Sequence, residues 1–159
     1  MRINRVILWL ILFPIFPLLF TQDVISGEIP SGEEIGNEIF NNISHEYTTC
    51  AAYFRIMSEA LRRSNDIETA NNYEQASESA LDRAFIAGQE GRTSEMAGKV
   101  VSSRFELETK SMLKEIDNNI ENISILMNKH LMHCEEIMGN PDKIMREWLD
   151  KILKKYDLN

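Results

Sequence analysis

Apolar residues recur at every third or fourth position through most of the chain, and that period is typical of amphipathic helices. It first runs over about residues 34–63, with steps of 4, 4, 3, 4, 3 and 4. The positions on this stripe are Ile39, Ile43, Tyr47, Cys50, Phe54, Met57 and Leu61. The period returns over about 66–87, about 95–138 and 140–159, and no stretch alternates with the period of two that a strand requires. We therefore expect an all-α fold, an antiparallel helical bundle of about four helices.

Residues that favour helix ends separate these stretches. The candidate N-caps are Ser64, Asn65 or Asp66 for the second helix, Thr93 or Ser94 for the third, and Asn140, followed by Pro141, for the last. A straight helix over 95–138 would be about 66 Å long. Because that is long for a chain of this size, a kink or a division near 108–112 is an alternative. Residues 34–159 are expected to form the helical domain, preceded by a flexible leader over 27–33.

The N-terminal part of the chain has a different pattern. Arg2 and Arg5 precede an apolar run over residues 6–20. The run is shorter than the roughly 20 residues that span a bilayer, and it matches the core of a secretory signal peptide. We expect residues 1–26 to be a signal peptide and the protein to be periplasmic or secreted. The alternative is a membrane-tethered helical protein that retains this segment, and only then is a membrane an expected partner.

Acidic residues outnumber basic ones in the chain. Asp and Glu number 25, Lys and Arg number 17, and the net charge is −8 at pH 7. Loss of residues 1–26 would make the charge one unit more negative, because Arg2, Arg5 and Asp23 would be removed. The phosphate backbone of a nucleic acid repels such a chain, so no nucleic acid is expected as a partner. The expected partner is an unknown protein or a small ligand.

The chain has two cysteines, Cys50 and Cys134, and each lies on the apolar stripe of a different helix. In an exported protein such a pair normally forms a disulfide, because the compartment is oxidising. Antiparallel packing of the first and third helices would bring the two stripes together. We therefore predict a Cys50–Cys134 disulfide that joins these helices.

A metal or haem site is the alternative function for the segment around Cys134. It would use His130 and His133, which lie on the same turn of the third helix. Further ligands would have to come from elsewhere, for example from His45 and Glu46 if the first helix runs alongside. A thiolate ligand at Cys134 would leave the other cysteine unpaired, so our first interpretation includes no metal site and no cofactor.

No arrangement of a nucleophile with a base is apparent in the sequence. It lacks G-x-S-x-G, H-E-x-x-H and a Gly-rich phosphate loop, so we predict no catalytic residue and do not expect an enzyme. Two aromatic features are candidate contact surfaces: the cluster of Tyr47, Tyr53 and Phe54, and Trp148 in the last helix. Aromatic residues at helical spacing usually face the core, and we favour that interpretation for all four.

Three parts of the sequence also carry a resemblance to a group of proteins. They are CAAYFRIMSEALRRS (50–64), MLKEIDNNIENISILMNKH (112–130) and Cys134. Together they resemble small exported helical two-cysteine proteins of Gram-negative bacteria. The resemblance covers about residues 48–150 and implies a periplasmic helical domain, without an activity or a site residue. The function that we expect is therefore that of an exported helical binding or interaction module.

Overall fold

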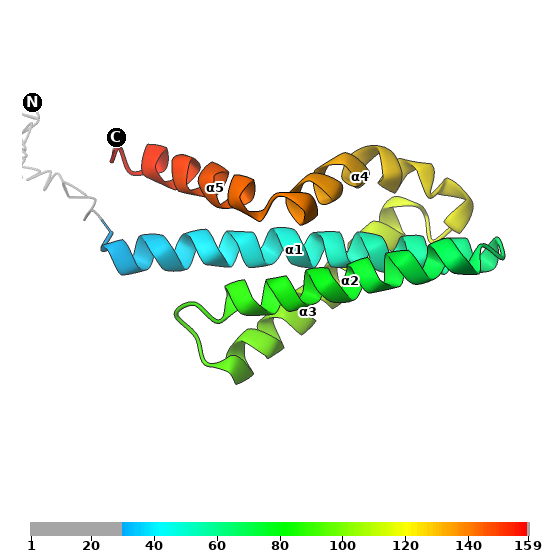
Figure 1. Cartoon of the computed structure of the whole chain (residues 1–159), viewed down its shortest axis with the longest axis horizontal. Coiled ribbons are helices and arrows are strands. Elements are labelled where there is room, and N and C mark those ends of the chain that lie inside the picture. The colour runs from blue at the N-terminus through cyan, green and yellow to red at the C-terminus, as the bar shows by residue number, and fades with distance from the viewer. Residues whose placement is uncertain (1–29, 159) are drawn as a thin grey trace, which may run out of the picture.

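The computed structural model describes residues 30–158, and this part of the chain is all-α, without a strand (Figure 1). The predicted signal peptide, residues 1–26, lies outside the described residues. Five α-helices and one short 3₁₀-helix follow one another along the chain: α1 Gly32–Arg63, α2 Ile67–Gly88, α3 Ser94–Glu115, η1 Ile120–Asn122, α4 Ser124–Gly139 and α5 Pro141–Lys155. The predicted all-α class is confirmed, but the helices number five instead of about four.

The longest helix, α1, is the centre of the fold, and the other helices pack around it (Figure 1). It begins at Gly32, two residues before the predicted start. Its first turn is closed by a capping box, in which the Glu34 main-chain N–H donates to the Ser31 hydroxyl and the Ser31 N–H donates to the Glu34 carboxylate. The predicted apolar stripe of α1 is buried through the middle of the helix, where Cys50 and Tyr53 are fully covered.

Helix α2 runs antiparallel to α1 and makes the most extensive contact with it. Its N-cap is Asp66, one of the three predicted candidates. Its alanine-rich face is buried at Ala70, Ala80 and Ala84, and the small side chains let the two helices approach closely. Two buried hydroxyls join them. Ser44 donates to the carbonyl of Ala84 at 2.8 Å, and Ser77 donates to the carbonyl of Ala51 at 2.9 Å.

The prediction of one continuous helix over 95–138 was wrong, because the chain reverses between Glu115 and Ser124. Asp117 and Asn118 adopt left-handed φ angles of 53° and 54°, which Asp and Asn tolerate better than most residues. The predicted alternative, a division near 108–112, also placed the break too early. As a result, α3 runs parallel to α1, and α4 returns antiparallel to it.

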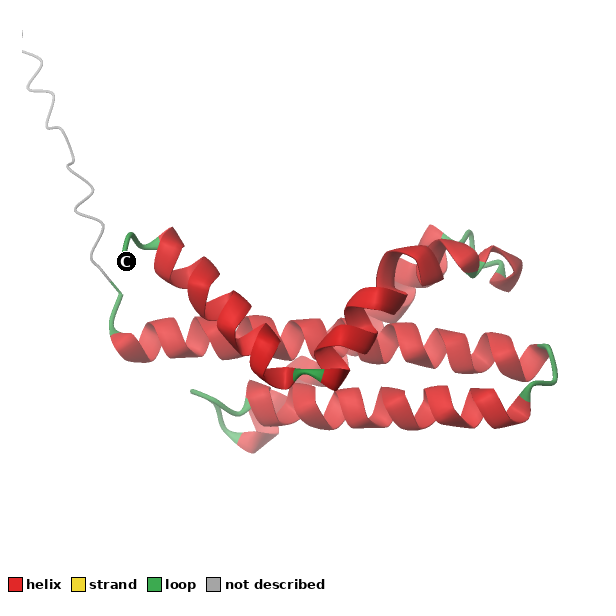
Figure 2. Cartoon of the chain, turned by 45° about the horizontal axis from the view of Figure 1, so that its top comes forward, coloured by secondary structure: helices red, strands yellow, loops and turns green. Residues whose placement is uncertain are grey.

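Helices α4 and α5 lie one after the other along α1 and form a V in Figure 2. The turn between them is capped as predicted: the Asn140 side chain accepts from the Lys143 N–H at 3.2 Å, and Pro141 is the first helical residue. At the far end of α5, Lys155 and the Tyr156 hydroxyl both donate to the Glu38 carboxylate on α1, at 2.6 and 2.8 Å. The C-terminal end is thereby attached to the start of α1.

Candidate functional site

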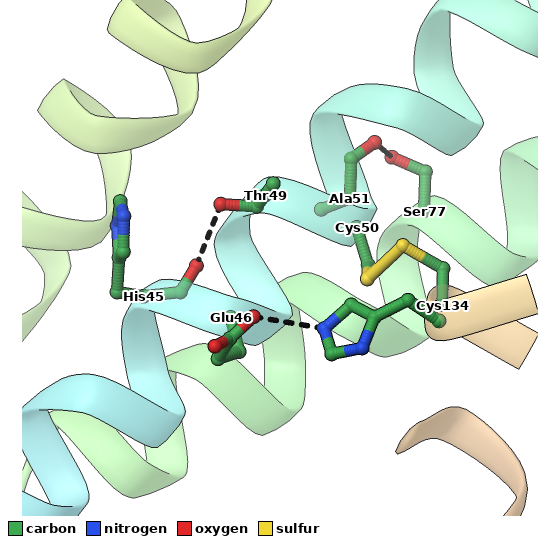
Figure 3. Close-up of a disulfide and its surroundings, with 8 residues drawn as sticks. His45, Glu46, Thr49, Cys50, Ala51, Ser77 and Cys134 are labelled. Carbon is green, nitrogen blue, oxygen red and sulfur yellow. Dashed lines mark hydrogen bonds and ion pairs between the residues drawn. A yellow bond between two sulfur atoms is a disulfide. The ribbon is translucent and has the colours of Figure 1, made fainter. Parts of the chain in front are cut away.

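The predicted disulfide is present. Cys50 of α1 and Cys134 of α4 are bonded at 2.07 Å, with their Cα atoms 5.4 Å apart, and both residues are fully buried (Figure 3). The two cysteines are 84 residues apart in the sequence. The bond therefore fixes α4 against the middle of α1. Such a bond is compatible with an oxidising or extracellular compartment.

The two histidines that were the alternative metal ligands have different surroundings. The His133 ring nitrogen Nε2 lies 2.9 Å from the Glu46 carboxylate of α1 (Figure 3). His130 turns towards Tyr53, with the two ring centroids 5.8 Å apart. Burial is the main cause of a lowered pKa at His130, and the positive charge of Lys129 adds to it.

The other two residues considered as ligands, His45 and Glu46, also have different neighbours. Glu46 lies beside His133, but His45 points away from the disulfide in Figure 3 and lies 3.8 Å from Glu108 of α3. Residues 30–158 contain no group of three His, Cys, Asp or Glu side chains placed to hold a metal ion. The histidines therefore connect different helices to α1: His133 connects α4 and His45 connects α3.

The aromatic cluster of α1 belongs mainly to the core, as we favoured. Tyr47 and Phe54 are each 4% exposed, and Tyr53 is fully buried. Trp148 is partly buried against the core, and the Lys151 ammonium lies 4.4 Å from the centre of its ring. Phe54 nevertheless lines a groove at the surface.

This groove lies between α1, α2 and α4 and has a volume of about 350 Å³. We call it the aromatic groove; its lining is Phe54, Asn72, Tyr73, Ala76, Glu135 and Met138. The rings of Phe54 and Tyr73 have their centroids 5.9 Å apart and are inclined at 54°. Its volume is within the range of small-molecule sites, at the low end. The groove is thus an apolar, aromatic surface with few polar groups on it.

One charge belongs to the aromatic groove, the carboxylate of Glu135. Glu135 is exposed on α4 and makes no hydrogen bond or ion pair with residues 30–158, so the carboxylate is available to a ligand. Behind the groove lies Tyr53, whose buried hydroxyl is without a hydrogen-bond partner in the same part of the chain. Burial is the main cause of its raised pKa, and Tyr73 and Glu135 contribute. The lining of the groove is therefore neutral except for the negative charge of Glu135.

A second groove, of about 380 Å³, lies between α1, α2 and α5. It is lined by charges of opposite sign, Arg83 and Glu90. The Arg83 guanidinium is already occupied, because it donates to the Met138 carbonyl at 2.7 Å and lies 5.8 Å from the Tyr47 ring centre. The aromatic groove has the more definite chemical character, since its single carboxylate is uncompensated.

Sequence reasoning identified Phe54 but missed its neighbours Tyr73 and Glu135. Within each helix the periodicity was sufficient to find the apolar face. The relative rotation of three helices determines which residues meet at the groove, and a single helix period carries no information on it.

Comparison of the chain with known protein families, with curated proteins and with solved structures finds no match. The resemblance to exported two-cysteine proteins therefore stays a prediction. Among the helices of residues 30–158, none combines the length and the apolar character needed to cross a bilayer.

Proposed function

We propose that this protein is an exported helical binding module whose aromatic groove holds an organic cation. The ligand would be an ammonium or guanidinium group carried on an apolar stem. The observation that supports this proposal is the convergence of the Phe54 and Tyr73 rings, 5.9 Å apart, with the unpaired Glu135 carboxylate in one groove. No group of the chain is assigned a catalytic role.

The chemistry of such a groove favours a cation in two ways. An aromatic face attracts a cation through its quadrupole, which contributes about 0.5–2 kcal/mol depending on desolvation. The Glu135 carboxylate adds an ion pair at the rim, with about 0.2–1 kcal/mol expected for an exposed pair. The net charge of −8 also raises the local concentration of cations. After the cost of immobilising the ligand, a dissociation constant on the order of 0.1–1 mM is expected.

Calorimetric or NMR titration with n-butylammonium tests this proposal, with n-butanol as the uncharged ligand of the same length. The cation should bind at least about tenfold more tightly than the alcohol. Glu135→Gln and Tyr73→Leu should each weaken its binding. Glu106→Gln is the matched control, because it removes the same charge at an exposed position on α3. Equal affinity for both ligands, or full affinity in Glu135→Gln, would overturn the proposal.

The cation could be a free small molecule or a side chain of a partner protein, and a second titration distinguishes these sources. A short lysine-containing peptide with blocked ends presents the same alkylammonium group beside a peptide backbone. If the peptide binds more tightly than n-butylammonium, the proposed occupant is a basic side chain of a partner. If butylammonium binds more tightly, the occupant is a free amine.

The export that we propose has two supports. One is the N-terminal segment with its apolar run over residues 6–20, and the other is the buried disulfide. Intact mass of the protein isolated from its source decides whether residues 1–26 have been removed or are retained as a membrane tether. Metal content and visible absorption of the same sample test the alternative site at His130 and His133.

A further inference from the structure

A second site of opposite charge lies where α3 crosses the first half of α1. The Arg104 guanidinium of α3 donates from Nη2 to the Asn41 side-chain oxygen at 2.8 Å and from Nη1 to the Asn41 main-chain carbonyl at 3.2 Å. Arg92, from the loop between α2 and α3, donates from its own Nη2 to the same side-chain oxygen at 2.8 Å. Two guanidinium groups therefore meet at one amide oxygen, and their Nη2 atoms are separated by at most twice that distance.

The loop before α3 holds Arg92 in this position. Gly91 has a φ of 69°, in the left-handed region that favours glycine, and a Cβ at this residue would lie 2.2 Å from the Asn37 side-chain oxygen. The loop backbone thus rests directly on α1, one helical turn before Asn41. Immediately afterwards, Thr93 caps α3. Arg92 is consequently placed by backbone packing on one side and by a helix start on the other.

The charge of this pair is not balanced by the surrounding chain. Arg55, Arg62 and Arg63 each form an ion pair with a glutamate. Within residues 30–158 neither Arg92 nor Arg104 forms one, although the chain is acidic overall. Both side chains are partly buried. The pKa of Arg104 is lowered, chiefly by burial and then by the charge of Arg92, so the structure holds two cations together against their mutual repulsion.

We propose that Arg92 and Arg104 bind a dianionic oxyanion, a phosphate group. A guanidinium has five N–H donors in a planar fork that matches the oxygens of a phosphate. Arg104 uses one N–H of each Nη on Asn41, and Arg92 uses one N–H on Asn41 and one on the Gly88 carbonyl at 3.4 Å. Of the five N–H groups on each guanidinium, three therefore remain for an anion. Two positive charges would be neutralised by one dianion. Asn41 is the positioning residue, because it accepts hydrogen bonds from both guanidinium groups.

This site is independent of the aromatic groove. Asn41 and Phe54 are separated by about 20 Å along α1, and the two sites attract ligands of opposite charge. Failure of cation binding at Glu135 would therefore leave the oxyanion site untouched. An alternative role for the two arginines is purely structural, in that they connect α3 and the loop to α1. That role predicts a loss of stability on substitution but no response of the wild-type protein to phosphate.

Titration of the full chain with inorganic phosphate tests the proposal, followed by calorimetry and by the thermal midpoint. Sodium chloride and sodium acetate at matched ionic strength are the reference salts. Phosphate should bind and raise the midpoint, and acetate should have a much smaller effect. Arg92→Gln should weaken phosphate binding at least about tenfold. Arg63→Gln removes the same charge at an exposed position at the end of α1 and should bind phosphate as the wild type does.

Two further arms complete the experiment. Arg104→Lys retains the positive charge but loses the planar guanidinium, so this variant should fold and bind phosphate weakly. Glycerol 3-phosphate is compared with inorganic phosphate. Tighter binding of glycerol 3-phosphate would indicate a phosphoryl group carried on a larger molecule, and tighter binding of inorganic phosphate would indicate the free ion. Absence of phosphate binding to the wild type, or unchanged binding in Arg92→Gln, would overturn the proposal.

Discussion

Replacement of both cysteines by alanine should reveal how much the Cys50–Cys134 bond contributes to stability. The bond joins residues 84 positions apart. In the chain-entropy description, a crosslink over a loop of this length stabilises the folded state by about 4–5 kcal/mol, because it restricts the unfolded chain. Loss of two fully buried sulfur atoms adds roughly 1 kcal/mol each. A total loss of about 6–7 kcal/mol is comparable to the whole stability of an ordinary domain.

Urea unfolding followed by far-UV circular dichroism measures this loss. The Cys50→Ala/Cys134→Ala variant should have a much lower free energy of unfolding. It should also have a steeper dependence on urea, because its unfolded chain is less compact and exposes more surface. Wild-type protein refolded under reducing conditions is the control, since it lacks the crosslink but retains both sulfur atoms. Its difference from the alanine variant isolates the packing contribution.

The two measurements together can contradict the reasoning. A decrease below about 2 kcal/mol with an unchanged urea dependence would show that the unfolded chain is not restricted by the bond as assumed. Hydrogen exchange adds a spatial test. Because the bond attaches α4 to α1, the amides of α4 and α5 should lose more protection than those of α2. Uniform loss over all helices would mean that the bond stabilises the bundle as a whole.

Three further predictions concern single residues. Ser77→Ala removes the buried hydrogen bond to the Ala51 carbonyl and should lower the free energy of unfolding by about 1 kcal/mol in urea titrations, with Ser79→Ala on the exposed face unchanged. Asn140→Ala removes the N-cap of α5 and should cost about 1 kcal/mol, visible as faster hydrogen exchange in the first turn of that helix. The lowered pKa of His130 means that the unfolded chain binds this proton more strongly, so its contribution to stability is complete above the ordinary pKa of 6.5 and is lost as the pH falls below that value. Wild type should therefore lose more stability than His130→Gln between pH 7.5 and pH 5.5, and parallel curves would refute this.

Local signals predicted the helix ends well, because a cap depends on residues that are neighbours in the sequence. Asn140 and Pro141 begin α5 as expected, and Asp66 caps α2. The disulfide was also predictable, since only two cysteines are available to pair. In each case the interacting groups are either adjacent in the chain or unique in it.

The chain reversal between α3 and α4 escaped prediction for a specific physical reason. Ile116, Ile120 and Ile123 retain spacings of 4 and 3 across it, because all three remain on the core side while the backbone turns. Periodicity alone therefore predicted a continuous helix through the reversal between Glu115 and Ser124. The available signal was the run Asp-Asn-Asn at 117–119, residues that accept left-handed φ angles and cap short turns.

The position of the disulfide also bears on the proposed ligand. Glu135 follows Cys134 directly, and Phe54 lies one helical turn after Cys50, so the bond that joins the cysteines also sets the distance between the carboxylate and the aromatic rings. If the aromatic groove binds an organic cation, the refolded dithiol form should bind n-butylammonium more weakly than the oxidised form, because α4 is no longer fixed against α1. The Glu135→Gln variant, which lacks the rim charge, should lose less affinity on reduction. Equal affinity of the oxidised and dithiol forms would mean that packing alone positions α4, and that the bond contributes to stability but not to the shape of the groove.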